Sequence, residues 1–150
     1  RQIHTPRPRA QEAQGHRQGF ADMSKLKWLD RRVSMPGPYL CLCLTEKAYK
    51  KAMRHCKVKN PPAWLTGSAT THTIEKPGAK DVTCIVAMNA DGFNDVEIYG
   101  LLVHEAVHVW QQFAVSIGEA SPASEQEAYA IQGISQELIA DYIRQKGSGK

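Results

Sequence analysis

The sequence contains no run of about 18 apolar residues, the length that a membrane-spanning helix requires. It has no apolar segment near its first residue, so we expect no secretory signal in the sequence as given. C-x-x-C spacing is also absent, although cysteines stand at positions 41, 43, 56 and 84. Because these cysteines lie in apolar segments, we expect buried free thiols rather than disulfides, and hence a protein of a reducing compartment such as the cytoplasm.

Positive charge is concentrated near the N-terminus. The formal net charge is +4, but residues 1–33 hold eight Lys and Arg against three acids, which gives +5 and leaves −1 for the other 117 residues. Residues 1–24 are rich in Arg, Gln, Ala and Pro, so we expect a disordered basic arm or an added tail there. We expect one domain over residues 25–146 and a flexible C-terminus over 147–150. If the chain binds nucleic acid, we therefore expect this N-terminal arm to make the contact.

Residues 101–110, LLVHEAVHVW, contain the pattern H-E-x-x-H. Residues four apart lie on one face of an α-helix, so His104 and His108 would offer their imidazoles to one ion, and imidazole is a common zinc ligand. Glu105 lies about 100° around the helix from His104, close enough to hold a water molecule bound to that ion. Metal-assisted hydrolysis requires this arrangement.

Two satisfied core histidines are the competing interpretation of the same pattern. With 6 histidines and 9 glutamates in 150 residues, chance predicts about 0.014 occurrences. The surrounding residues are apolar almost all round, as in a buried helix: Leu101, Leu102, Val103, Ala106, Val107 and Val109. Polar side chains in such a helix cost free energy unless something satisfies them, and a metal ion would do so. We therefore predict a zinc site.

A catalytic zinc needs a third protein ligand and an open position for water. No histidine follows His108, so the candidates are the downstream acids Glu119, Glu125, Glu127, Glu137 and Asp141. Residues 121–146 predict a single helix, with Ser121 as its N-cap and Pro122 at its first position.

Helical phase separates these candidates. Glu127 lies one turn before an apolar stripe, whereas Glu125 falls on a more polar face; the stripe is formed by Ile131, Ile134 and Leu138. Glu127 is therefore the predicted ligand. Its alternative role is a capping box with Ser124, and Pro122 argues against that role because it starts the helix earlier.

The segment HEAVH, followed after 18 intervening residues by Glu127 in SEQEAYAIQ, resembles the gluzincin group of zinc metallopeptidases. The small size resembles the single-domain minigluzincins, and the overall character resembles small proteins encoded by phages and prophages. The resemblance covers about residues 82–146. It implies a zincin-like fold and a zinc metalloendopeptidase acting on peptide or protein substrates, with His104, His108 and Glu127 as zinc ligands and Glu105 as general base.

A transition-state oxyanion needs a donor besides zinc, and Tyr142, His72 and Tyr129 are the candidates. The alternative function is a non-catalytic structural or interaction protein, such as a virion or secretion component, in which zinc only joins two helices. The small size also suits a latent peptidase that a partner protein activates. An open groove at the fourth coordination position favours an enzyme, and a blocked one favours the structural role.

The remaining patterns predict an α+β protein with a small, mostly antiparallel sheet packed against the two metal-bearing helices. The expected strands cover residues 39–44, 63–75 and 81–88, and the other helices cover 45–56 and 95–116. His72 is expected to be an exposed strand residue. If residues 82–88 form the cleft edge, as in zincin-like folds, they would bind a peptide by strand addition; a fully buried core strand fits their apolar run equally well.

Overall fold

A computed structural model describes residues 27–29, 38–75 and 82–147, so the expected arm over 1–24 and residues 148–150 lie outside the described residues. The elements run in the order β1 (Tyr39–Cys43), α1 (Glu46–His55), β2 (Ala69–Ile74), β3 (Thr83–Met88), α2 (Asp95–Ser116) and α3 (Ser124–Gly147). Helices and a sheet thus share one fold, as the patterns predicted, and the α+β class is confirmed.

The sheet has the strand order β1-β3-β2, with β1 parallel and β2 antiparallel to β3. It is therefore mixed, and the prediction of a mostly antiparallel sheet is wrong. All six residues of β3 are buried, because β3 is paired along both edges and covered on both faces. The interpretation of residues 82–88 as a cleft edge is also wrong, and the core-strand alternative is correct. The edge strands are β1 and β2, and β2 is the one that contacts α2.

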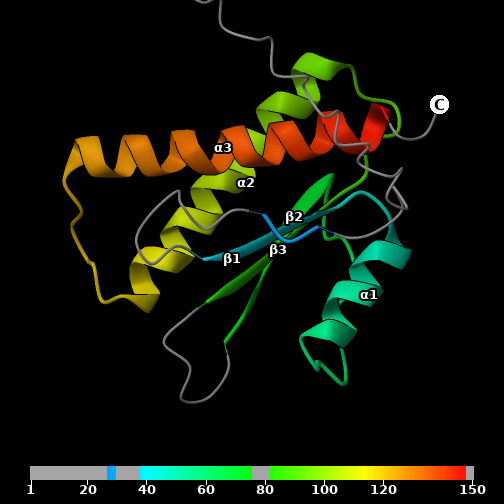
Figure 1. Ribbon diagram of the computed structural model, residues 1–150, viewed down its shortest axis with the longest axis horizontal. Coiled ribbons are helices and arrows are strands. Elements are labelled where there is room, and N and C mark those ends of the chain that lie inside the picture. The colour runs from blue at the N-terminus through cyan, green and yellow to red at the C-terminus, as the bar shows by residue number, and fades with distance from the viewer. Residues whose placement is uncertain (1–26, 30–37, 76–81, 148–150) are drawn as a thin grey trace, which may run out of the picture.

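The sheet separates two hydrophobic cores (Figure 1). Helices α2 and α3 cover one face, where the alternate strand residues Leu40, Leu42, Cys84 and Val86 point. Helix α1 covers the other face, where Cys41, Cys43, Ile85 and Ala87 point. This division follows from the two-residue period of a strand, which sends neighbouring side chains to opposite faces.

Helix α2 begins and ends where its local sequence predicts. The Asn94 carboxamide oxygen accepts bonds from the amides of Val96 and Glu97, and the Glu97 carboxylate accepts from the Asn94 amide at 2.8 Å, which completes the predicted capping box. At the other end, Gly118 has a φ of 74°, a left-handed conformation that glycine adopts at little cost. The chain therefore leaves α2 abruptly and returns as α3.

Helix α3 begins at Ser124, two residues after Pro122, the predicted first position. The first helical bond runs from the Glu127 amide to the Ala123 carbonyl at 3.0 Å, so Ala123 occupies the capping position. Ser121 lies in the preceding turn instead, where its amide donates to the Glu119 carboxylate at 3.1 Å. The prediction of Ser121 as N-cap is wrong because this local contact holds the chain outside the helix.

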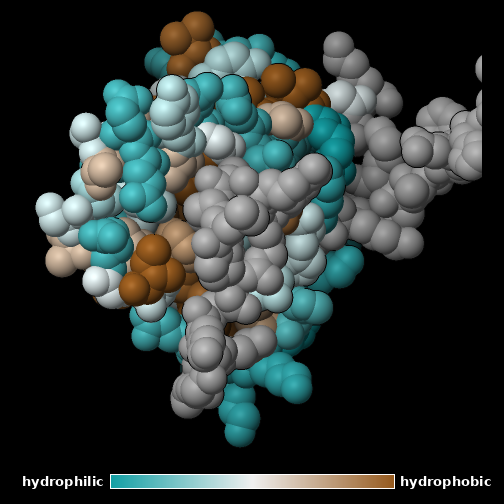
Figure 2. Space-filling view, turned by 60° about the vertical axis from the view of Figure 1, so that its left-hand side comes forward, coloured by the Kyte–Doolittle hydropathy of each residue, from teal (hydrophilic) through white to brown (hydrophobic). Residues whose placement is uncertain are grey.

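Exposed hydrophobic side chains are scattered over the described surface. Figure 2 shows small separate hydrophobic areas among hydrophilic ones on the face in view. The largest exposed fractions belong to Val96, Val115, Tyr129 and Ile143. None of the helices in the described part of the chain has the length and apolar character needed to cross a bilayer.

Candidate active site

Helix α2 brings the imidazoles of His104 and His108 together. Their Nε2 atoms lie 3.1 Å apart, and both side chains are exposed. His108 Nδ1 lies 3.3 Å from the Gln111 Oε1 atom, which can only accept, so a proton on Nδ1 would donate to it and leave the Nε2 lone pair for a metal. Gln111, three residues along the same helix, is therefore placed to orient His108 for binding a metal through Nε2.

Glu105 is buried between α2 and β2, with 4% of its surface exposed. The Thr71 hydroxyl donates a 2.6 Å hydrogen bond to Glu105 Oε2. A buried carboxylate needs such a donor, because removing it from water otherwise costs several kcal/mol. The bond also fixes the orientation of the carboxylate beside the two imidazoles.

A pocket of about 310 Å³ opens at these three side chains. Besides His104, Glu105 and His108, it is lined by Gln112 of α2 and by threonines of β2 and the preceding turn, including Thr66, Thr71 and Thr73. A second hollow of about 510 Å³ shares Ala69, His104 and Glu105 with the first and adds the apolar surface of Phe93 and Leu101. Open space therefore extends to both sides of the Glu105 carboxylate.

The main chain of β2 also faces this space. The Asn89 amide donates to the Ser68 carbonyl, which marks Ser68 and Asn89 as a hydrogen-bonded pair of the antiparallel ladder. Such pairs alternate along a ladder, so the amide and carbonyl groups of Thr71 and Thr73 point away from β3. These groups form an edge, beside the pocket, to which another strand can add.

Glu127 lies on the predicted face of α3, but it does not join the histidines. Its side chain is half-buried and lies in line with the buried stripe of Ala130, Ile134 and Leu138, whereas the Glu125 side chain is exposed. Among the described residues, no three His, Cys, Asp or Glu side chains lie close enough together to hold a metal ion. The structure therefore brings two of the three predicted zinc ligands together, His104 and His108, and does not group Glu127 with them.

His72 lies on the opposite face of the sheet from this pocket. It is 8% exposed, its Nε2–H donates to the Trp64 carbonyl at 2.9 Å, and its ring lies 4.7 Å from that of Tyr49 in α1. The prediction of an exposed strand histidine is wrong, because strand alternation sends His72 into the α1 core while its neighbour Thr71 faces α2. His72 is not positioned to contact an oxyanion in the pocket.

The two tyrosine candidates also lie away from the pocket. Tyr142 is buried near the end of α3, and its hydroxyl lies 3.5 Å from the Asp95 carboxylate at the start of α2. Tyr129 is 68% exposed and does not line the pocket. Among the residues that line the described pocket, Gln112 offers a neutral hydrogen-bond donor, whereas the Thr70 hydroxyl already donates to the Ala69 carbonyl at 2.8 Å.

Sequence reasoning did not identify Thr71 and Gln111 as contacts of the site. Gln111 could have been found, because it lies three residues after His108 on a predicted helix. Thr71 could not have been found in this way. The threonine-rich run predicted a strand, but no local signal shows that this strand lies at the sheet edge with Thr71 facing Glu105.

The fold and the site together define an α+β protein whose H-E-x-x-H helix lies beside a free sheet edge. Comparison with models of known protein families, with curated proteins and with solved structures found no match.

Proposed function

We propose that this protein is a zinc-dependent metalloendopeptidase of zincin-like fold that cleaves peptide or protein substrates. The observation that carries the proposal is the 3.1 Å approach of the His104 and His108 Nε2 atoms beside the buried carboxylate of Glu105. The pocket at these side chains gives a substrate access to all three.

The two imidazoles fit two positions on a zinc ion. Zinc–nitrogen bonds of about 2.0–2.1 Å in a tetrahedron separate two nitrogen ligands by roughly 3.3 Å. The observed separation of 3.1 Å is within a few tenths of this value. Glu127 is proposed as the third ligand because it is the half-buried acid at the start of the helix that packs on α2. Binding it to the same ion requires a shift of the first turn of α3 or of its side chain.

A zinc ion held there would supply a Lewis acid that polarises the scissile carbonyl and acidifies water. Glu105 Oε1 accepts the proton of the attacking water and passes it to the leaving amine. The Thr71 hydroxyl occupies Oε2 at 2.6 Å and so keeps Oε1 available for that proton.

The edge of β2 is the proposed binding surface for the substrate main chain. A peptide in extended conformation would pair with the outward amide and carbonyl groups of Thr71 and Thr73. Its side chains would then alternate between the polar pocket and solvent, and the hollow formed by Phe93 and Leu101 would accept an apolar side chain next to the cleaved bond. A substrate bound on both sides of Glu105 would extend in both directions from the cleaved bond, which supports an endopeptidase.

The openness of the pocket supports the peptidase over a structural zinc site. A zinc ion that only joins α2 to α3 would be enclosed by four protein ligands. The histidines instead face a pocket of about 310 Å³.

Replacing the general base tests the chemistry. We expect Glu105→Gln to reduce cleavage of a denatured protein substrate by at least about a thousandfold while zinc content, measured by atomic absorption, stays at the wild-type level. Glu125→Gln is the matched control, because Glu125 is exposed on α3, and it should retain full activity. Wild-type protein that binds zinc but cleaves no denatured substrate would refute the peptidase.

Replacing the ligands tests the metal site separately. We expect His104→Ala, His108→Ala and Glu127→Ala to lose zinc, with affinity falling by about a hundredfold or more, whereas Glu125→Ala keeps it. Zinc retention in Glu127→Ala together with loss in both histidine variants would assign the third ligand to another residue. Retention in the histidine variants would refute the site itself.

A further inference from the structure

Charge is divided between the two faces of the molecule. Residues 46–59, which cover α1 and the turn after it, hold six Lys and Arg against one acid, for a net charge of +5. Residues 60–150, which include α2 and α3, hold five bases against eleven acids, for a net charge of −6. Figure 1 shows α1 on the other side of the sheet from α2 and α3, so α1 lies opposite the helix that carries the candidate active site.

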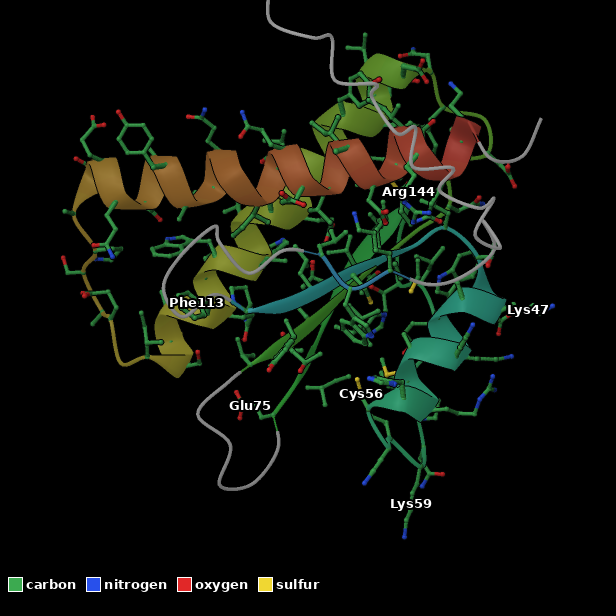
Figure 3. All side chains as sticks on the ribbon, viewed as in Figure 1. Lys47, Cys56, Lys59, Glu75, Phe113 and Arg144 are labelled. Atoms are coloured by element: carbon green, nitrogen blue, oxygen red, sulfur yellow. The ribbon has the colours of Figure 1, made fainter. Side chains whose placement is uncertain are left out.

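The positive side chains of α1 form a row at helical spacing. Lys47, Lys50, Lys51 and Arg54 occupy positions i, i+3, i+4 and i+7, which lie on one face of the helix, and all four are exposed. Lys57 and Lys59 extend the row beyond the helix end, and Figure 3 shows Lys47 and Lys59 pointing outward at its two ends. We call these six side chains the α1 basic row.

The α1 basic row is largely uncompensated. Within the described residues, Lys50 alone among the six has an ion-pair partner, Glu46 at 2.7 Å, and both side chains of that pair are more than half exposed. Like charges at i, i+3 and i+4 repel one another and destabilise the helix slightly. A polyanion that pairs with the row would remove this repulsion and release its own counterions.

An aromatic pair lies at the C-terminal end of the row. The rings of Trp28 and His55 are 5.3 Å apart, His55 is exposed, and Trp28 is half-buried. Aromatic rings next to a row of cations are the combination with which proteins bind unpaired bases and their phosphates. The contact also places the exposed Lys27 at this end of α1.

We propose that the α1 basic row and the Trp28–His55 pair bind the backbone of a nucleic acid, preferentially a single strand. The cations recur every three to four residues along a rigid helix, which suits a polymer with evenly spaced charges. Binding there would leave the pocket on the opposite face open. The inference does not depend on catalysis, because none of its residues lines that pocket.

An anionic membrane is a poorer partner for the same face. A helix that lies in a bilayer surface inserts apolar side chains below its cations. The apolar residues of α1, Tyr49, Ala52 and Met53, are buried against the sheet, and no large hydrophobic side chain of α1 is exposed. The exposed face of α1 could therefore bind a membrane only through its positive charges.

Fluorescence anisotropy with a labelled single strand of about 20 nucleotides, and with the matching duplex, tests the inference on the full chain. The test variant combines Lys47→Gln, Lys51→Gln and Arg54→Gln. The control variant combines Lys76→Gln, Lys80→Gln and Lys150→Gln, so both variants lower the formal net charge from +4 to +1. Circular dichroism and the melting temperature establish that both variants are folded.

We expect the test variant to bind the single strand at least about tenfold more weakly than wild type. The slope of log affinity against log salt should fall in magnitude by about 2, because three phosphate contacts are lost. The control variant should bind like wild type. Equal weakening in both variants would show an effect of net charge alone and overturn the proposal, as would wild-type binding by the test variant.

Two competitors cover the other classes of partner. Vesicles of phosphatidylserine and phosphatidylcholine test an anionic membrane, and poly-glutamate tests an acidic protein. We expect neither to displace the labelled strand at equal charge concentration. Tighter binding of either competitor than of the nucleic acid would overturn the proposal.

Discussion

Thr71 and Glu105 are 34 positions apart in the chain, yet their 2.6 Å hydrogen bond joins β2 to α2 at the centre of the candidate site. The contact joins a neutral hydroxyl to a buried carboxylate. Such a bond contributes more than a bond between two neutral groups, because the carboxylate has few other donors once it leaves water. Thr71 is therefore a positioning residue, which acts through Glu105.

Removing the hydroxyl tests this role. We expect Thr71→Val, which preserves the shape and strand preference of the side chain, to lower kcat about tenfold, equivalent to roughly 1.4 kcal/mol of transition-state stabilisation. KM should stay near the wild-type value, because the Thr71 hydroxyl acts through Glu105 and not through the substrate. Thr73→Val is the control two residues along the same face, and Thr71→Ser should restore the wild-type kcat.

A rise in KM at unchanged kcat in Thr71→Val would contradict the positioning role. A loss of stability without a change in kcat would assign Thr71 a purely structural function. Urea unfolding of the same variant separates the two outcomes.

At the scale of the element, α3 is held to the sheet by a buried charge. Asp141 is 3% exposed, and its carboxylate accepts from Arg144 at 2.6 Å and from Gln145 at 2.8 Å. The Gln145 amide also donates to the Leu42 carbonyl of β1 at 3.1 Å. This network connects the last turns of α3 to a strand residue 103 positions earlier, and so it sets where the helix lies on the sheet.

We expect Asp141→Ala to lower the free energy of unfolding by about 3 kcal/mol, because Arg144 and Gln145 would lose their buried partner. Glu46→Ala removes the exposed pair with Lys50 and should change the same quantity by less than about 0.5 kcal/mol. Urea denaturation followed by circular dichroism measures both. A cost for Asp141→Ala as small as that of Glu46→Ala would contradict the anchoring role.

At the scale of the whole molecule, both cores contain cysteine. Cys41, Cys43 and Cys56 lie on the α1 side and Cys84 on the other side, all buried and none in a disulfide, as predicted. The hydrogen bond with Cys43, followed by burial, raises the pKa of the Cys41 thiol well above its usual range. Burial raises the pKa of Cys84 to about 12. The Cys41 and Cys84 thiols therefore stay neutral in the fold and are poor nucleophiles.

Thiol labelling tests the integrity of both cores. We expect the native protein at pH 8 to react with a thiol reagent only as fast as it unfolds, and the protein in guanidinium to expose four reactive thiols. Stability should fall as the pH rises above about 9, because the unfolded thiols then lose protons that the folded ones retain. Fast labelling of one or more thiols in the native state at pH 8 would contradict the buried placement.

Local patterns were sufficient for the helices. The spacing of His104 and His108 predicts their approach, because helical geometry alone places residues four apart together. Asn94 and Glu97 predict the start of α2 in the same way, since a capping box involves only neighbouring residues. The spacing of apolar residues also predicts the buried stripe of α3, and this stripe places Glu127 on the side of α3 that packs against α2.

The tertiary structure alone decided which strand lies beside the site and which way its side chains point. The sequence predicted strands near 63–75 and 81–88, but only the pairing with β1 makes β3 central and β2 an edge strand. That pairing sends Thr71 to Glu105 and His72 to the opposite core. Strand order and register depend on contacts between distant segments, and a local period cannot encode them, whereas the imidazole pair needs only one helix.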